Sequence, residues 1–311
     1  MKKVYRACLN DMVPPLHQGI TICAIGGLGN QLFQYAVGRS IAVRLGSKLF
    51  LDCRRHKKVS NRPLLLNHFC HHGEILESNF LPLKISKFFF KNFEIPKLVA
   101  QGRFVEEIPN DQLRQVGSAK LGDYLRGFWQ DPSHFSEIEN LLREELRFVT
   151  RSSSNNLEIQ EQISNCCAVS VHIRRGDYLT NPHHKATFAS CNPAYYAKAF
   201  DALVSKLGNT PVFFVFSDDQ KWAKENIRFP GKAVFVTHND NSSSWEDMRL
   251  MAQCQHHIIA NSTFSWWGAW LNASPSKIVV APRNWFTTDL DKKSPLLLPY
   301  FVVVENEQIL G

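Results

Sequence analysis

The sequence of 311 residues lacks the features that mark membrane-spanning and disulfide-framed proteins. No stretch approaches the roughly 18 consecutive apolar residues of a spanning helix. The eight cysteines have no regular spacing, which favours a reducing compartment over a disulfide framework. Polar residues and prolines follow the first lysines, where a signal peptide has an apolar stretch. We therefore expect a cytoplasmic protein.

Several motifs of well-known sites are also missing. The turn at Gly26–Gly29 has Leu32 in place of the third glycine of the dinucleotide fingerprint, and it lacks the lysine of a Walker loop. No Gly-x-Ser-x-Gly sequence indicates a serine hydrolase. Asp218 and Asp219 are adjacent rather than one residue apart, and Asp289-Leu-Asp291 falls in a polar loop. The histidine pairs have no metal-ligand spacing with a cysteine pair, so we expect no bound metal.

The composition fits a globular protein with an anionic ligand. The chain is 44% hydrophobic and 21% charged, and it is long enough for two domains. Its net charge of +8 fits a nucleotide sugar, a nucleic acid or an acidic membrane surface. The aromatic residues fall at core spacing, with no basic stripe between them, so we expect no nucleic-acid partner.

The segment from Ser170 to Tyr178 is the most informative part of the chain. Cys167–Ile173 is apolar and rich in β-branched residues, which predicts a central strand covered on both faces. Arg174, Arg175, Gly176 and Asp177 follow at its carboxyl end, where open α/β sheets bind ligands. A guanidinium fork there suits a pyrophosphate. A structural cluster of ion pairs that caps the strand is the alternative.

The second half of the chain alternates strands and helices, which predicts right-handed βαβ units and a parallel sheet. The expected strands after Cys167–Ile173 are 212–216, 233–236, 257–260 and 277–281, and the expected helices are 193–207, a short one around 222, 245–254 and 264–271. This part is predicted to be a Rossmann-like domain.

The first half is less regular. A strand is expected at 20–25, a helix at 31–45 and a second strand at 49–51, whereas 53–130 shows no clear period. Ser152–Asn156 has the composition of a linker between the two parts. We therefore divide the chain into an N-terminal α/β lobe, residues 1–155, and a C-terminal Rossmann-like lobe, residues 156–311, with a cleft between them.

Two turns offer backbone N–H groups at the start of a helix. Gly26–Gln31 joins a strand to a helix and suits an anion, although a tight turn that needs positive φ explains it equally well. Asn261–Ser265 adds hydroxyl groups to a second helix start. Trp266, Trp267 and Trp270 of that helix are interpreted as core residues.

Four blocks in order resemble the bacterial α-1,2-fucosyltransferases of glycosyltransferase family 11. They are Gly26–Ala36, Val171–Tyr178, Phe216–Asp219 and Asn261–Leu271, and the resemblance extends from about residue 20 to 285. It implies a two-lobed fold of the glycosyltransferase B type that binds the nucleotide sugar in the C-terminal lobe, facing the cleft. It also implies a metal-independent, inverting enzyme that uses GDP-fucose as donor substrate. Neighbouring linkage types, α-1,6 or protein O-fucosylation, and a non-catalytic nucleotide-binding protein remain as alternatives.

The resemblance assigns roles to residues of these blocks. Arg174 grips the diphosphate, with Arg175 beside it, and His172 lies near the nucleotide. Asp247 pairs with the guanine edge. The remaining nucleotide-sugar residues come from three turns: Gly27, Gly29 and Asn30, then Ser217, then Asn261, Ser262, Thr263 and Ser265. Asp177, the carboxylate nearest the arginines, is the candidate general base, and orienting Arg174 is its alternative role.

The implied acceptor is a galactose-terminated glycan, which a lipid carrier could hold. Lys84–Lys97 interleaves lysines with phenylalanines. Peripheral contact with the anionic inner face of a membrane is one interpretation of this segment. Burial of the phenylalanines, with the lysines extending to solvent, is the other.

Overall fold

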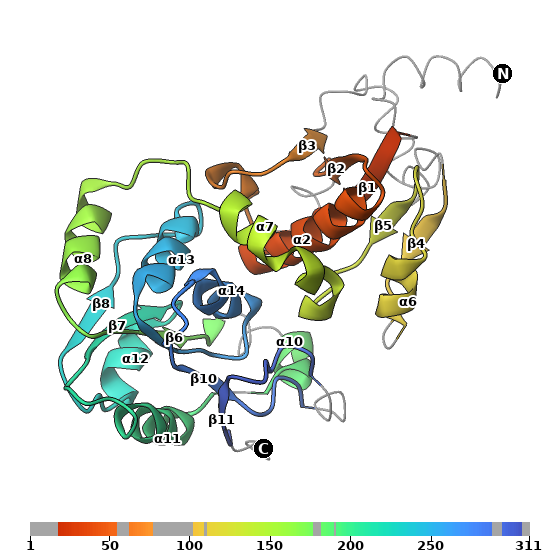
Figure 1. Cartoon of the computed structure of the whole chain (residues 1–311). Coiled ribbons are helices and arrows are strands. Elements are labelled where there is room, and N and C mark those ends of the chain that lie inside the picture. The colour runs from red at the N-terminus through yellow and green to blue at the C-terminus, as the bar shows by residue number, and fades with distance from the viewer. Residues whose placement is uncertain are drawn as a thin grey trace. The chain divides into compact units, whose positions relative to one another are not determined.

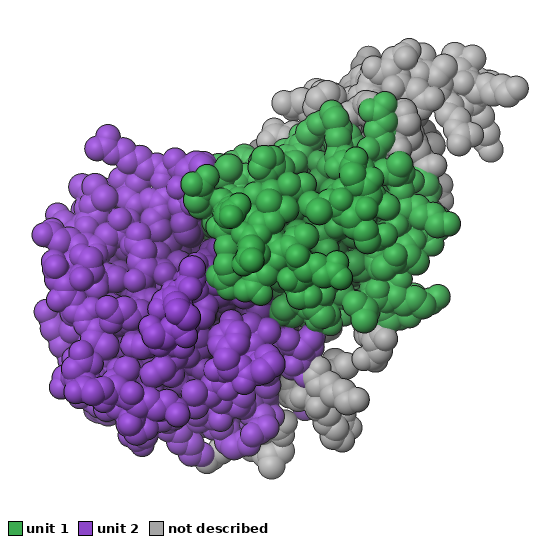
Figure 2. Space-filling view, viewed as in Figure 1, with its two compact units in different colours: residues 1–147 green, residues 148–311 purple. Residues whose placement is uncertain are grey.

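The structure is a computed structural model that describes residues 18–54, 62–76, 102–108, 111–176, 182–189, 191–287 and 294–306. It divides into two compact units, residues 1–147 (unit 1) and 148–311 (unit 2), which Figure 2 shows in separate colours. Each unit contains one sheet whose strands all run parallel. The prediction of two Rossmann-like lobes is therefore confirmed.

Unit 1 is built on a five-stranded sheet in the order β3-β2-β1-β5-β4. Its strands are β1 (Gly19–Cys23), β2 (Lys48–Asp52), β3 (Gly73–Leu76), β4 (Phe104–Glu106) and β5 (Tyr124–Arg126), and its helical segments are α2 (Leu28–Arg44), η2 (Leu66–His68), α6 (Gln112–Gly117), η4 (Pro132–Ile138) and α7 (Glu139–Glu145). Helix α2 packs so closely on β1 and β2 that a Cβ at Gly38 would lie only 2.6 Å from Leu49 Cδ1.

A buried ion pair joins α2 to α7. Arg39 donates from Nε and Nη2 to both carboxylate oxygens of Glu145, at 2.6 to 3.1 Å. The hydroxyl of Tyr35 donates to the same carboxylate at 2.8 Å. The side chain of Glu145 is only 5% exposed, so these donors replace its hydration.

Unit 2 is built on a six-stranded sheet in the order β11-β10-β9-β6-β7-β8. Its strands are β6 (Ala168–Ile173), β7 (Val212–Ser217), β8 (Ala233–Val236), β9 (His256–Ile258), β10 (Val279–Pro282) and β11 (Val302–Val304), and its helices are α8 (Ser154–Ser164), α10 (Pro182–Thr187), α11 (Pro193–Val204), α12 (Gln220–Asn226), α13 (Ser244–Gln253) and α14 (Thr263–Leu271). Numbered within the unit, this order is 6-5-4-1-2-3, the doubly wound arrangement.

Alternation along β6 and β7 divides the core of unit 2 between the two faces of the sheet. Val169, Val171 and Ile173 pack with α11 and α12 on one face. Phe214 and Phe216 pack with α8 and α13 on the other. Because helices cover both faces, the strands are apolar throughout rather than alternating with polar residues. Figure 1 shows these helices around β6 and β7.

Most elements predicted for unit 2 are confirmed within a few residues, and Pro193 is the first residue of α11 as expected. Trp266, Trp267 and Trp270 are buried core residues, also as expected. The short strands β3, β4, β5 and β11 were missed, because three or four residues cannot establish a period.

The predicted linker is wrong in its second half. Helix α8 begins at Ser154, and Asn156 is only 1% exposed. The segment that precedes α8 bonds to α13: Ser153 N donates to Glu246 Oε1 at 3.2 Å, and Ser152 Oγ donates to Glu246 Oε2 at 3.2 Å. Residues 148–155, which we assigned to the N-terminal lobe, thus fall in unit 2.

Among the described residues, no helix is both long and apolar enough to span a bilayer. The lysine- and phenylalanine-rich segment Lys84–Lys97 lies outside the described residues.

We predict that Glu145→Ala destabilises unit 1 by roughly 3 kcal/mol, because it leaves the partly buried Arg39 and the buried Tyr35 without their acceptor. Glu139→Ala on the same helix is the matched control. Its pair with Arg143 is half exposed and contributes about 0.5 kcal/mol or less. Urea unfolding measures both, and equal losses in the two variants would contradict the prediction.

Candidate functional site

The strand order of unit 2 indicates which edge of its sheet is the candidate ligand site. The chain order reverses between β6 and β9, which pair in parallel with Val171 opposite Ile258. Both strands therefore deliver their following segments, Arg174 onward and Ile259 onward, to the same edge. Doubly wound sheets bind their ligands outside the carboxyl ends of the strands at this switch point.

The carboxylate of Asp218 fixes the loop that follows β6. Its Oδ1 accepts from Arg175 N at 2.8 Å, and its Oδ2 accepts from Gly176 N at 3.0 Å. Arg174 Nη1 pairs with Oδ2 at 2.8 Å. A Cβ at Gly176 would lie 2.8 Å from the same oxygen, so glycine is needed for this approach. Asp218 thereby holds the backbone of the loop and one edge of the Arg174 guanidinium.

The two arginines have different partners. The Arg175 guanidinium stacks on the Trp222 ring, with its central carbon 3.6 Å from the ring centroid. Arg175 Nε lies 3.6 Å from Asp219 Oδ2. Arg174 is therefore held by Asp218, whereas Arg175 is held by Trp222 and Asp219. Asp177, the candidate base, lies outside the described residues.

The second aspartate of the pair Asp218-Asp219 is a helix cap. Asp219 Oδ1 accepts from Trp222 N at 3.1 Å at the start of α12. Ser217, at the end of β7, accepts from Asp219 N at 3.0 Å through its hydroxyl. Both carboxylates thus serve protein donors. Across the residues that the structure describes, no group of three or more histidine, cysteine or acidic side chains could hold a metal ion.

His172 is buried at the end of β6 on the face of the sheet that α14 covers. Its ring lies 5.7 Å from the ring of Phe264, centroid to centroid, and its carbonyl accepts from the Tyr196 hydroxyl at 2.9 Å. Burial, with the adjacent charge of Arg174, lowers the pKa of His172 to about 3. Its Nδ1 has no hydrogen-bond partner among the described residues. His172 is thus a neutral imidazole beside the diphosphate candidate Arg174.

The turn from β9 into α14 contains two residues whose side chains hold its backbone, and it ends at the first residues of the helix. Asn261 is buried and donates to the carbonyls of Ala189 and Trp285, at 2.6 and 2.9 Å. Ser265 Oγ donates to the carbonyls of Ala260 and Ser262, at 3.4 and 3.3 Å. Asn261 and Ser265 therefore shape the turn.

Ser262 is the N-cap of α14 and accepts from Phe264 N at 3.3 Å, and Thr263 is the first helical residue. The first turn of α14 carries no acidic side chain, so the positive end of its dipole is not neutralised there.

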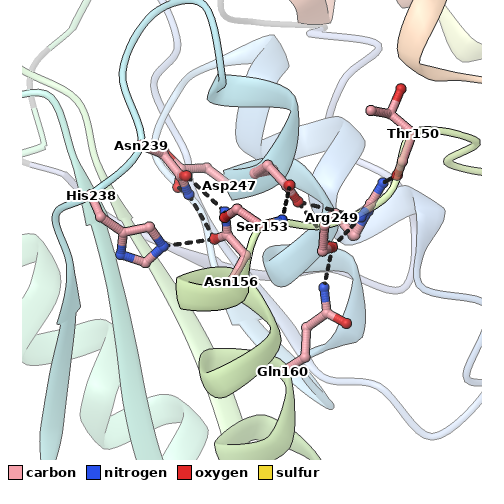
Figure 3. A network of polar contacts seen from close by, with 10 residues as sticks. Thr150, Ser153, Asn156, Gln160, His238, Asn239, Asp247 and Arg249 are labelled. Atoms are coloured by element: carbon pink, nitrogen blue, oxygen red, sulfur yellow. Dashed lines mark hydrogen bonds and ion pairs between the residues drawn. The ribbon is translucent and has the colours of Figure 1, made fainter.

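Asp247 lies in the first turn of α13, at the same edge of the sheet. Its Oδ1 accepts from Asn239 Nδ2 at 2.7 Å. Burial raises the pKa of Asp247 to about 7; the Asn239 bond opposes this rise, and the neighbouring Glu246 carboxylate adds to it. Asn239 and its partner Asn156 were not predicted, since their segments read as a polar loop and a linker (Figure 3).

The glycine-rich turn of unit 1 lies at the switch point of its own sheet, between β1 and β5. Gly26 has a φ of +82°. Gly27 is the N-cap of α2, and the carbonyl of Gly27 accepts from Asn30 N at 2.9 Å. Gly29 is buried. Gln130 Nε2 donates to Asn30 Oδ1 at 2.9 Å. Gly26 therefore has the positive φ that glycine adopts without strain, as one alternative predicted.

Two buried glutamines that sequence reasoning missed hold this turn. Gln34 accepts from Ile25 N at 3.0 Å and donates to the carbonyl of Gly127 at 2.9 Å, which ties the β1 turn to the end of β5. Gln31 donates to the carbonyl of Gly26 at 2.9 Å. Polar side chains on the apolar face of a predicted helix were the available signal.

We predict that His172 makes unit 2 less stable in acid. The unfolded chain binds this proton near pH 6.5, while the folded chain resists it to about pH 3, so stability is lost as pH falls below 6.5. At pH 5 the loss is about 2 kcal/mol. Urea unfolding followed by tryptophan fluorescence reports mainly on unit 2, which has six of the seven tryptophans. His172→Asn should reduce the loss between pH 7 and pH 5 by that amount; an unchanged loss would contradict the prediction.

Comparisons with known proteins identify the family of the chain. The family model described as "Glycosyl transferase family 11" matches residues 3–304. An alpha-1,2-colitosyltransferase of Escherichia coli is 36% identical over 278 residues, covering 84% of this chain and 90% of that protein. The O-antigen biosynthesis glycosyltransferase WbnK of Escherichia coli is 34% identical over 288 residues, covering 85% and 94%. The galactoside alpha-(1,2)-fucosyltransferase 1 of Saimiri sciureus is 38% identical over 104 residues, covering 33% and 28%. The chain therefore belongs to glycosyltransferase family 11.

Proposed function

We propose that this glycosyltransferase moves L-fucose from GDP-β-L-fucose to the 2-hydroxyl of a terminal galactose, forming an α-1,2 linkage with inversion. The names of two similar proteins, an alpha-1,2-colitosyltransferase and a galactoside alpha-(1,2)-fucosyltransferase, support the linkage. One observation carries the proposal. Arg174 follows β6 and α14 follows β9, and these two strands are parallel neighbours at the switch point of the sheet. A permanent cation and a helix N-terminus suit a diphosphate there.

In this reaction the acceptor oxygen bonds to the anomeric carbon while the bond from that carbon to the β-phosphate oxygen breaks. The electron pair of the broken bond remains on GDP, so negative charge grows on the diphosphate. Arg174, already oriented by Asp218, stabilises this charge together with the positive end of the α14 dipole. His172, a neutral imidazole at this strand end, is the candidate nucleotide contact beside Arg174.

The acceptor hydroxyl loses its proton as the new bond forms. Asp177, one residue beyond the loop that Asp218 holds, is our candidate to receive it. Asn30 is the candidate contact to the sugar, and Gly27 and Gly29 are candidate nucleotide-sugar residues of the same turn. Asp247 is proposed to accept from guanine N1–H and N2–H₂, which adenine cannot match. Arg175, stacked on Trp222, adds positive charge beside the diphosphate.

A second donor is supported by one comparison. The alpha-1,2-colitosyltransferase matches over most of both chains. Colitose is fucose without its 3-hydroxyl group, so GDP-colitose fits any site that does not hydrogen-bond that hydroxyl. A site that does so rejects the deoxy sugar strongly, since its polar groups would be left without partners. The ratio of kcat/KM for the two donors separates these functions.

The similarity to an O-antigen biosynthesis glycosyltransferase supports a bacterial glycan as acceptor. A lipid carrier that holds this glycan is part of the proposal. We propose that the protein works in the cytoplasm, where nucleotide sugars are made, and meets this carrier at the inner face of the membrane. Linkage determination of the product distinguishes α-1,2 from α-1,6 transfer and from protein O-fucosylation.

We expect Arg174→Lys to lower kcat by about 100-fold or more, since lysine keeps the charge but loses the planar fork that Asp218 orients. Arg228→Lys, at an exposed position of unit 2, is the matched control and should keep wild-type activity. Fucose transfer to lactose, measured as GDP released with GDP-fucose as donor, provides the assay. Turnover of Arg174→Lys within a few-fold of wild type would remove Arg174 from this role.

We expect transfer to continue unchanged in excess EDTA, because Asp218 and Asp219, the pair at the strand end, already accept bonds from protein donors. The measurement is the initial rate with and without EDTA on protein dialysed against the chelator. Loss of activity that Mn²⁺ restores would contradict this expectation.

A further inference from the structure

Two asparagines form a closed amide pair behind Asp247. Asn156 Nδ2 donates to Asn239 Oδ1 at 2.9 Å, and Asn239 Nδ2 donates to Asn156 Oδ1 at 3.0 Å. The second hydrogen of Asn239 Nδ2 is directed at Asp247 Oδ1, 2.7 Å away. Figure 3 shows the pair, with Asp247 on one side and His238 on the other.

The pair allows one orientation of Asn239 while Asp247 is ionised. If the Asn239 amide were turned over, its oxygen would face both the Asp247 carboxylate and Asn156 Oδ1, which are acceptors. Asn156 is held in turn from its other side, since its Nδ2 donates to Ser153 Oγ at 2.9 Å and its Oδ1 lies 2.8 Å from His238 Nε2. Asn156 is 1% exposed, so each lost bond leaves a buried polar group without a partner.

We propose that Asn156 and Asn239 are positioning residues for the donor nucleotide: they direct one N–H at Asp247 Oδ1 and so keep this carboxylate ionised and oriented for guanine. The inference rests on the proposed guanine contact of Asp247. Asp247 Oδ2 has no hydrogen bond within the described part of the chain, so that oxygen remains available to a nucleobase. Asn239 itself touches the carboxylate, and Asn156 acts through Asn239.

The charges around Asp247 make such support necessary. Glu246, next to it on α13, is buried and repels a second negative charge, although Arg249 lies 3.4 Å from that carboxylate. On α8, Glu158 and Glu161 are exposed, and α14 has no ionisable side chain. His238 reaches the site only through Asn156. Asn239 therefore provides the one hydrogen bond to Asp247 in the described residues, against the burial that raises its pKa.

The test is the affinity for GDP, by calorimetry, of wild type and Asn239→Leu at pH 6, 7 and 8.5. Loss of a hydrogen bond to a carboxylate raises its pKa by about one unit. From a pKa near 7, Asn239→Leu should bind GDP about fivefold more weakly at pH 7 and within about twofold of wild type at pH 8.5. The titrations of phosphate and guanine affect both proteins and cancel in the ratio.

Asn156→Ala should also bind GDP more weakly at pH 7, because Asn239 loses the partner that fixes its orientation. Its affinity should return to near the wild-type value at pH 8.5. Asn155→Ala, at the adjacent exposed position of α8, is the matched control and should bind GDP as wild type does at every pH. A deficit that is equal at all three pH values means that the pair is merely structural and overturns the inference, and so does unchanged affinity.

Asp247→Asn separates this inference from the proposed function. If that variant binds GDP with wild-type affinity, the guanine contact itself is wrong. If it loses affinity by about tenfold or more while Asn239→Leu matches wild type, the guanine contact stands and only the role of the amide pair fails.

Discussion

The geometry of the candidate donor site depends on one carboxylate, that of Asp218. Two backbone N–H groups and one guanidinium converge on it from the loop after β6. Without this acceptor, the charged residues that follow β6 would lose these three bonds, which hold them in one conformation. The energy of these charge-assisted hydrogen bonds fixes where Arg174 lies before any ligand arrives. Orientation in advance is what makes a cation effective against charge that develops only during the reaction.

The surroundings give four of the acidic residues near this edge different chemistry. Asp218 accepts from three donors, and Asp219 caps a helix. Glu246 ties the segment before α8 to α13 and pairs with Arg249. Within the described segments, Asp247 has a single donor, and its pKa is raised to about 7. The carboxylate with the fewest protein partners is thus the one best suited to exchange hydrogen bonds with a ligand.

The sequence predicted the sheet of unit 2 well because its strands are buried on both faces and separated by helices with clear starts. The arginine loop and the helix start after β9 could be placed at one edge from strand topology alone. The roles of Asp218 and of the pair Asn156 and Asn239 could not, since their contacts join segments 42 to 83 residues apart. The same holds for Gln34, whose bond to Gly127 joins two strand ends of unit 1.

Polar tracts were the other source of error. Ser152–Asn156 has linker composition, yet its hydroxyl and amide groups bond to α13 and to the loop before it. Composition records how many polar groups a segment has and not whether they find partners in the protein.

The central claim is that the donor diphosphate binds at the switch point between β6 and β9. A crystal structure of the protein with GDP tests it most directly. The account predicts phosphate oxygens within hydrogen-bond distance of the Arg174 guanidinium and of the N–H groups at the start of α14, with guanine at Asp247. A diphosphate bound elsewhere, away from Arg174 and the start of α14, would contradict it.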